Sequence, residues 1–430
     1  MRNSPAPQLR LRSLDGLRGV AAAIVLLHHL SMTIPAVSDG YDSAKNLTLF
    51  SPAWWFVASP LKIFVAGPEF VLVFFVLSGF VLTLSPLARL TQSRDAANAD
   101  SPMPPRRYDW ASYYPRRIVR LGVPVVASMV LAVAVITTLP HPSSAGAGSW
   151  LQRQASPDVS FGNLLSETLL IVDPSRPGVN PPLWSLTWEL WFSLLLPVAV
   201  LIALWTRRFP VLWAIAFCGV SVFGYVEHIT AATFLPAFAL GALLGANAER
   251  IHDAVDRWRN RSGFTPIWAA IAVAGPMLSI SFWMLRPLLN GNGADVALAM
   301  RVPGAVLMVA TVAFWPAAAR VFDVKPLAGL GRISFSVYLV HSPVVVAFGL
   351  MFTGATWWIG ALSSIAVTAV LTLLMYGLVE RPSQRLAAWL GARISATLEA
   401  VVARTSRPTA VPDRLARAEV AMFERMSSIR

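Results

Sequence analysis

The chain has 430 residues, of which 56% are hydrophobic and only 13% are charged, and its mean hydropathy is +0.59. A soluble domain carries roughly 25% charged residues, so this composition excludes an ordinary water-soluble protein. The net charge of +13 would suit nucleic-acid binding, but the placement of the basic residues favours a membrane protein without a nucleic-acid partner. The single cysteine, Cys218, can form no internal disulfide, and no Cys/His cluster has zinc-ligand spacing, so we expect no metal.

The first apolar stretch follows a basic N-terminal segment, a pattern that secretory signal peptides share. The basic region from Arg2 to Arg12 is followed by the apolar residues Gly19–Leu30. Because this run is long and no clear small-x-small cleavage site follows it, we interpret it as an uncleaved first transmembrane helix.

Ten apolar stretches approach the ~20 residues that a helix needs to cross a bilayer. They lie at about 19–37, 63–84, 121–140, 184–205, 211–227, 230–247, 266–285, 302–319, 333–353 and 358–379. The sequence therefore predicts an all-α integral membrane protein, a bundle of about ten transmembrane helices whose termini share one side.

The basic residues indicate which side is cytosolic, because Lys and Arg collect in cytosolic loops. With the N-terminus inside, the cytosolic segments hold 29 of the 35 Lys and Arg residues. We therefore predict a multi-pass protein of the cell (inner or plasma) membrane with N- and C-termini cytosolic. The outer segment 141–183 is long enough for a lid or mouth.

Two parts of unequal size are expected: a membrane domain over 1–380 and a cytosolic tail over 381–430. The tail contains apolar residues three and four apart with arginines beside them, which predicts a basic amphipathic helix on the inner leaflet or on the protein. Its apolar stripe is Leu415, Ala418, Met422, Met426 and Ile429.

Titratable side chains inside predicted spans are costly, so each is a candidate functional residue. In the first helix, Arg18 and His29 are eleven residues apart, close to three turns, and point to one face. His28 is turned away by about 80°. The structural alternative is that Arg18 anchors the helix at the cytosolic surface and that the histidines are satisfied core residues.

The second and third helices carry further candidates. The second has Glu69, Ser78 and Gly79, of which the two small residues could instead serve close helix packing. In the third, Arg117 and Arg120 at i and i+3 share a face at the cytosolic surface. They are either topology anchors or a holder of phosphate groups.

Glu189 in the fourth helix lies among three tryptophans and needs a partner, either a structural salt bridge or a catalytic role. Tyr338 and His341 are i, i+3 neighbours in the ninth helix. At 1.5 Å per residue, the arginines would lie at the inner mouth, His29 and His341 near the midplane, and Glu189, with Glu69, nearer the outer face. This predicts a polar path, which an enzyme that passes a group across the membrane, or a transporter, would need.

Six segments between residues 12 and 382 resemble, in order, the acyltransferase-3 family of integral membrane acyltransferases. They are Arg18 followed after ten residues by His29, Phe-Phe-Val-Leu-Ser-Gly-Phe at 74–80, Arg117-x-x-Arg120, Trp184-Ser-Leu-x-x-Glu189-x-x-Phe192, Ser334-x-x-x-Tyr338-Leu-x-His341 and Glu380-Arg-Pro382. The resemblance implies a ten-helix domain that takes an acyl group from cytosolic acyl-CoA to an acceptor hydroxyl, often on a cell-envelope sugar. It also implies that the Arg-x10-His and Arg-x-x-Arg pairs are functional.

This chain departs from the family pattern at two positions. Many relatives have an acidic residue just before the Phe-Phe run, where this chain has Leu72-Val73, and Glu69 stands one turn earlier. The usual Glu-Glu of the fourth helix is Glu189-Leu190. Both departures concern the acceptor side.

We therefore expect an acyl-CoA-dependent O-acyltransferase that transfers an acetyl or other short acyl group to a hydroxyl of a cell-envelope glycan or glycolipid. His29 would be the general base, Arg18 would steady the CoA end or the developing oxyanion, and Arg117 and Arg120 would bind CoA phosphates. Glu189 would orient a histidine or the acceptor. The expected substrate-pocket residues are Glu69, Ser78, Tyr338 and His341.

Other functions fit parts of the same pattern. The acceptor could be a small molecule such as a macrolide, acylated on the cytosolic side. A proton-coupled transporter could use the same groups as a relay, but no internal repeat supports it. A non-catalytic sensor or scaffold would leave the buried titratable groups unexplained. In the enzyme hypothesis, acyl-CoA, such as acetyl-CoA, is a co-substrate.

Overall fold

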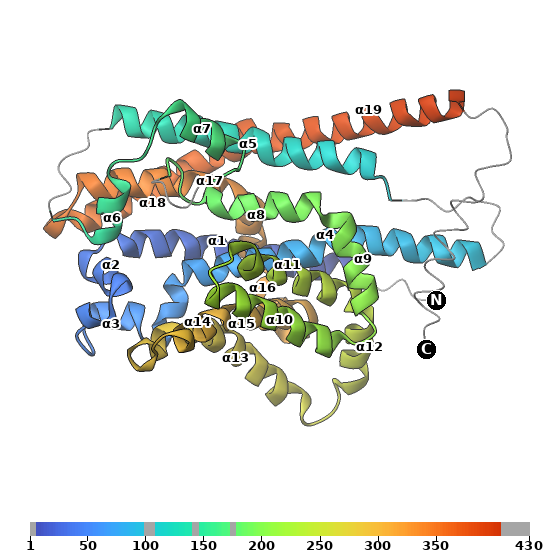
Figure 1. Ribbon diagram of the computed structural model, residues 1–430, viewed down its shortest axis with the longest axis horizontal. Helices are drawn as coiled ribbons and strands as arrows, with labels where there is room; N and C mark the ends of the chain where they lie inside the picture. The colour runs from blue at the N-terminus through green and yellow to red at the C-terminus, as the bar shows by residue number, and fades with distance from the viewer. Residues whose placement is uncertain (1–5, 99–107, 140–145, 173–177, 406–430) are drawn as a thin grey trace.

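The computed structural model describes residues 6–98, 108–139, 146–172 and 178–405 (Figure 1), and these ranges contain helices and loops but no strand. In Figure 1 most of the longest helices run side by side along the long axis of the molecule, and the helices α10–α16 pack along one flank. The amphipathic stripe predicted over 415–429 lies outside the described residues.

The long helices are α1 (Ala6–Met32), α4 (Gly67–Asn98), α5 (Trp110–Thr138), α13 (Phe264–Leu285), α17 (Lys325–Met351), α18 (Trp357–Met375) and α19 (Arg381–Thr405). The shorter ones are α2 (Pro35–Asp42), α3 (Pro52–Val57), α6 (Ser149–Gln154), α7 (Phe161–Thr168), α8 (Leu183–Leu194), α9 (Leu196–Thr206), α10 (Pro210–Val226), α11 (Thr230–Ala246), α12 (Ala248–Trp258), α14 (Asn292–Ala299), α15 (Arg301–Phe314) and α16 (Pro316–Phe322). Short 3-10 segments lie at Ala44–Asn46, Pro60–Val65, Arg286–Leu288 and Gly354–Thr356, and a π-helix at Tyr376–Glu380 joins α18 to α19.

Six helices in the described ranges are long and apolar enough to cross a membrane, and up to nine spans result if each of three bent pairs counts as one. The 17-residue α10 is a shorter apolar helix. Each of the ten predicted stretches overlaps an observed helix. The prediction of an all-helical, multi-pass membrane protein is therefore confirmed, while the count of ten and the side of the termini stay predictions.

Three stretches predicted as single helices are broken: 302–319 at Trp315, between α15 and α16, and 19–37 and 184–205 at sharp bends. α2 follows α1 at an angle of 99°, because Pro35 disfavours the helical conformation at Ile34, which is extended with φ −84 and ψ 116. The stretch 184–205 is two helices, α8 and α9, at 70° to each other. The break falls just before Pro197, which has no N–H to donate to the helix.

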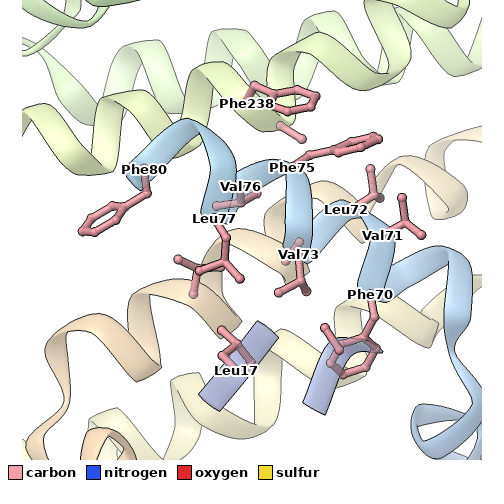
Figure 2. Close-up of a cluster of buried hydrophobic side chains, with 14 of the residues drawn as sticks. Leu17, Phe70, Val71, Leu72, Val73, Phe75, Val76, Leu77, Phe80 and Phe238 are labelled. Atoms are coloured by element: carbon pink, nitrogen blue, oxygen red, sulfur yellow. The ribbon is translucent and has the colours of Figure 1, made fainter. Parts of the chain in front are cut away.

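Backbone contacts at glycines hold the central helices together. A Cβ atom at Gly331 would overlap the carbonyl oxygen of Asp15, so α1 and α17 touch directly. A Cβ atom at Gly79 would overlap the carbonyl oxygen of Phe238, so Gly79 serves close packing of α4 against α11. Figure 2 shows the buried apolar side chains of α4 between Phe238 and Leu17. These contacts position α1, α4 and α17, which carry most of the candidate residues.

Candidate functional site

A cavity of about 60 Å³ lies where α1, α4, α5, α8, α17 and the π-helix meet. Apolar walls from α4 and α17 surround a group of charged and polar side chains, so this is a polar site inside an apolar bundle. The cavity includes six of the nine site residues that the sequence predicts: Arg18, Ser78, Arg117, Arg120, Glu189 and Tyr338. His29, His341 and Glu69 do not line it.

Arg117 and Glu189 form an ion pair in this cavity. Arg117 Nη2 lies 2.6 Å from Glu189 Oε1, and Arg117 Nε donates to Ser193 Oγ at 2.8 Å. Ser78 Oγ donates to the same carboxylate oxygen at 3.4 Å. The carboxylate of Glu189 therefore orients an arginine. Of its two expected roles, orienting a histidine or the acceptor, the first has no supporting hydrogen bond among the described residues, and the second stays a prediction.

The depth of Glu189 also differs from the estimate based on helical rise. That estimate assumed that the fourth helix starts at the outer face. Instead, the segment before α8 folds into the bundle, because Asn180 Nδ2 donates to Leu339 O at 3.0 Å and to Ser128 Oγ at 3.3 Å, near the middle of α17 and α5. α8 therefore begins part-way along the bundle, as Figure 1 shows, and Glu189 reaches the level of Arg117, with which it forms an ion pair.

His29 and His341 meet outside the cavity. His29 Nδ1 lies 2.8 Å from His341 Nε2, and His341 Nδ1 lies 3.0 Å from the carbonyl oxygen of Val337. A carbonyl oxygen can only accept, so His341 Nδ1 carries its proton and His341 Nε2 accepts from His29 Nδ1. This leaves Nε2 of His29 as an unprotonated nitrogen that can take up a proton.

Tyr338 lies between the cavity and the histidine pair. Its side chain lines the cavity, and its ring centroid is 5.8 Å from that of His341. The hydroxyl shares a 2.6 Å hydrogen bond with Ser185 Oγ and lies 3.1 Å from the carbonyl oxygen of Pro182. Tyr338 is thus held in place by the segment that leads into α8.

The opposite side of His29 is covered by α6, which belongs to the segment 141–183 expected to form a lid or mouth. The Trp150 ring stacks on the His29 ring with a centroid separation of 5.5 Å. α6 is held to α2 because Trp150 N donates to Ser38 Oγ at 2.8 Å and Ser149 Oγ lies 2.9 Å from the same oxygen. In this structure α6 closes the approach to His29 from that side.

Glu69 lies in a separate buried cluster. Its carboxylate accepts a hydrogen bond from Trp283 Nε1 at 2.8 Å and lies 3.2 Å from Arg301 Nε and 3.8 Å from Lys62 Nζ. Lys62 also donates to the hydroxyl of Tyr41. Glu69 and Lys62 are completely buried, so the structure places Glu69 in the framework of the fold and not in the cavity.

Glu380 is a cavity residue to which the sequence reasoning assigned no role. It ends the π-helix, accepts from Ser336 Oγ at 2.5 Å and from Gln384 Nε2 at 3.1 Å, and lines the cavity with Arg18 and Arg120. π-Helical turns occur frequently at functional sites. The signal for Glu380 was the Glu380-Arg-Pro382 segment, which we used only for the resemblance.

The cavity combines three arginines with two carboxylates, which makes it suited to an anionic group. Arg117 is paired with Glu189, whereas Arg18 and Arg120 have no hydrogen-bond or ion-pair partner within the described ranges. Guanidinium groups whose N–H donors are not already engaged bind phosphates well. The described residues contain no group of three His, Cys, Asp or Glu side chains placed to hold a metal ion.

Comparisons with known proteins match the chain to acyltransferases. A family model described as an acyltransferase domain matches residues 11–377, a range that contains all nine predicted site residues. The acyltransferase clz18 of Cochliobolus lunatus is 24% identical, with 78% of this chain and 83% of that protein covered. The acyltransferase R4 of Phoma sp. is also 24% identical, with 80% and 85% covered. No solved structure matches the chain.

Proposed function

The chain belongs to the acyltransferase family whose model spans residues 11–377, and from this premise we propose that it transfers an acyl group from cytosolic acyl-CoA to a hydroxyl of a cell-envelope glycan or glycolipid. Family membership makes it an enzyme that transfers acyl groups. The proposal adds the donor, the acceptor and the base. We propose that the transferred group is acetyl or another short acyl group.

The contact between His29 and His341 carries the proposal. Because His341 Nε2 accepts from His29 Nδ1 at 2.8 Å, Nε2 of His29 is left with its lone pair. An alcohol is a weak nucleophile at neutral pH, and a positioned histidine that removes its proton accelerates transfer by about 10²–10⁴-fold. His341 acts here as a positioning residue, since it sets the tautomer and ring orientation of His29.

The arginines of the cavity support a site for the phosphates of CoA. Arg18 precedes His29 by eleven residues on one helix, which is roughly 16 Å at 1.5 Å per residue. This spacing is too long for Arg18 to stabilise an oxyanion beside His29. It suits a donor whose phosphates and thioester lie at opposite ends of an extended pantetheine arm. The arm would pass Tyr338, which lies between the cavity and His341.

The reaction then has a simple balance. The acceptor hydroxyl gives its proton to His29 Nε2 as its oxygen attacks the thioester carbonyl carbon. The tetrahedral intermediate collapses, the new ester C–O bond remains, and the C–S bond breaks. The protonated His29 returns the proton to the CoA thiolate. None of these reaction steps requires an acyl-enzyme on Ser78. The Ser78 hydroxyl donates to Glu189 and contacts neither histidine.

Oriented proteoliposomes test the proposal. Radiolabelled acetyl-CoA should be consumed only when it is on the side that carries the basic loops, and a membrane-impermeant glycan acceptor should be labelled only from the opposite side. No transfer to any envelope acceptor, with donor hydrolysis also absent, would contradict acyl-CoA dependence.

A second candidate is acylation of a small molecule that enters from the same side as acyl-CoA. The Trp150 ring on His29 and the bonds that hold α6 to α2 favour it, because they close the approach from the α6 side. In the same experiment, labelling of an impermeant acceptor on the donor side would select this candidate.

A further inference from the structure

Helix α7 has the reverse of the polarity expected on a water-exposed surface. Phe161 and Leu165 on α7 and Leu169 at its C-cap follow one another at i, i+4 and i+8, and they are 80%, 46% and 54% exposed. On the opposite side, Asn163 and Glu167 are only 3% and 2% exposed. A surface helix in water buries its apolar stripe and exposes its charges. α7 exposes the apolar stripe and buries the carboxylate.

The buried polar side of α7 is fully engaged by its own segment. The Glu167 carboxylate accepts from Asn163 Nδ2 at 2.8 Å, from Val179 N at 2.8 Å and from Asn180 N at 3.0 Å. These bonds satisfy non-helical backbone that leads from α7 towards α8. Irregular backbone at membrane depth is tolerated only where it is buried in protein with its polar groups satisfied. The arrangement meets that requirement.

The depth of this segment follows from its contacts with two long helices. Asn180, whose N–H binds Glu167, also binds Leu339 O and Ser128 Oγ, near the middle of α17 and α5. α7 therefore lies beside the bundle and not beyond its end, and Figure 1 shows it alongside α5. α5 is a candidate membrane span, and it exposes Val126 (48%) and Val130 (66%). Because α7 packs against α5, its exposed apolar face lies beside a span whose own exposed side chains are apolar.

We propose that the described parts of 161–182 belong to a re-entrant element and that the exposed face of α7 contacts lipid hydrocarbon in the leaflet that borders α6. The packing of α7 against α5, a candidate membrane span with exposed apolar side chains, identifies lipid chains, not a protein partner, as the occupant of this face. The element enters the bilayer at Phe161 and reaches the level of Asn180. From there the chain continues into α8. This changes the nature of the segment 141–183, part of which is membrane-embedded and not a loop in water.

Spin-label accessibility tests the proposal on the full chain. In a Cys218→Ala background, Leu165→Cys carries a nitroxide, and the protein is reconstituted in phosphatidylcholine vesicles. Oxygen, which concentrates in hydrocarbon, should relax this label more strongly than a water-soluble nickel chelate does. Val130→Cys on α5 is the matched lipid-facing control, and exposed Gln152→Cys on α6 is the control for water.

The outcomes separate the possibilities. A Leu165 label that follows the Val130 control supports a lipid-facing α7. A label that the nickel chelate reaches as readily as at Gln152 places α7 in water and overturns the proposal. Protection from both relaxants means that protein covers the face, which also overturns it. Phe161→Cys repeats the measurement on the same face if the Leu165 variant does not fold.

Discussion

Arg117 is held on two sides by α8, since its Nη2 lies 2.6 Å from Glu189 Oε1 and its Nε donates to Ser193 Oγ at 2.8 Å. Arg120, one turn further along α5, lines the same cavity without a hydrogen-bond or ion-pair partner in the described part of the chain. The two arginines of one short motif therefore have different surroundings. Arg117 organises the cavity wall, and Arg120 is available to a ligand.

The ion pair of Arg117 and Glu189 should behave as one unit. Both side chains are largely buried, at 10% and 17% exposure, and removing one partner of a buried pair costs about 3–5 kcal/mol. Arg117→Gln and Glu189→Gln should each lower the melting temperature clearly. The double variant should be less destabilised than the sum of the two, measured by thermal unfolding in detergent. Strict additivity would show that the pair is not coupled.

Arg120→Gln should weaken acyl-CoA binding and leave the melting temperature nearly unchanged, because no partner within the described residues loses a bond. Arg120→Lys should bind more tightly than the Gln variant but less tightly than the parent, since the charge stays and the bidentate fork is lost. Isothermal titration with acetyl-CoA measures both. Equal affinities in all three proteins would exclude Arg120 from the donor site.

Removing the base His29 should lower kcat more than removing its neighbour His341. We expect His29→Ala to reduce kcat by about 10²–10⁴-fold. His341→Phe should reduce kcat by at least about 10-fold with little change in KM, and His341→Gln should recover part of it, because an amide oxygen can again accept from His29.

His28→Ala serves as the neighbouring control. His28 Nδ1 lies 3.0 Å from Val65 O, away from His341, so its loss should cost about 1 kcal/mol of stability and little activity. Inactive His28→Ala alongside active His29→Ala would reverse the assignment of the base.

Glu69→Gln should destabilise the protein and spare the chemistry. It leaves Lys62, which is fully buried, and Arg301, which is 12% exposed, without their counter-charge, and this should cost about 3–5 kcal/mol. The kcat of the folded fraction and the KM for the acceptor should stay within about twofold of the parent. The exposed Glu249→Gln is the control for stability. A raised acceptor KM would indicate that Glu69 contributes to the substrate pocket, as the sequence predicted.

A disulfide between α2 and α6 should show whether α6 must move. The Oγ atoms of Ser38 and Ser149 are 2.9 Å apart, so cysteines at both positions in a Cys218→Ala background are close enough to oxidise. If the acceptor approaches His29 from the α6 side, the oxidised protein should be inactive and a reductant should restore activity. Full activity of the oxidised form would mean that the acceptor takes another route.

The sequence by itself determined the properties that depend on neighbouring residues. Apolar runs near 20 residues predict membrane helices because backbone groups in lipid must be satisfied within the helix. The helical period also indicates which side chains share a face, as for Arg18 with His29 and for Tyr338 with His341. The ordered motifs were sufficient to indicate the family, which the match over residues 11–377 confirms.

Only the tertiary structure decided which of these faces meet. His29 and His341 are 312 residues apart and touch because α1 packs directly on α17. Glu189 meets Arg117, and Glu69 lies in another cluster. Depths counted from the helical rise do not predict either placement. The start of α8 is set by the bonds of Asn180 to α5 and α17, and a contact between distant segments leaves no periodic signal in the residues that make it.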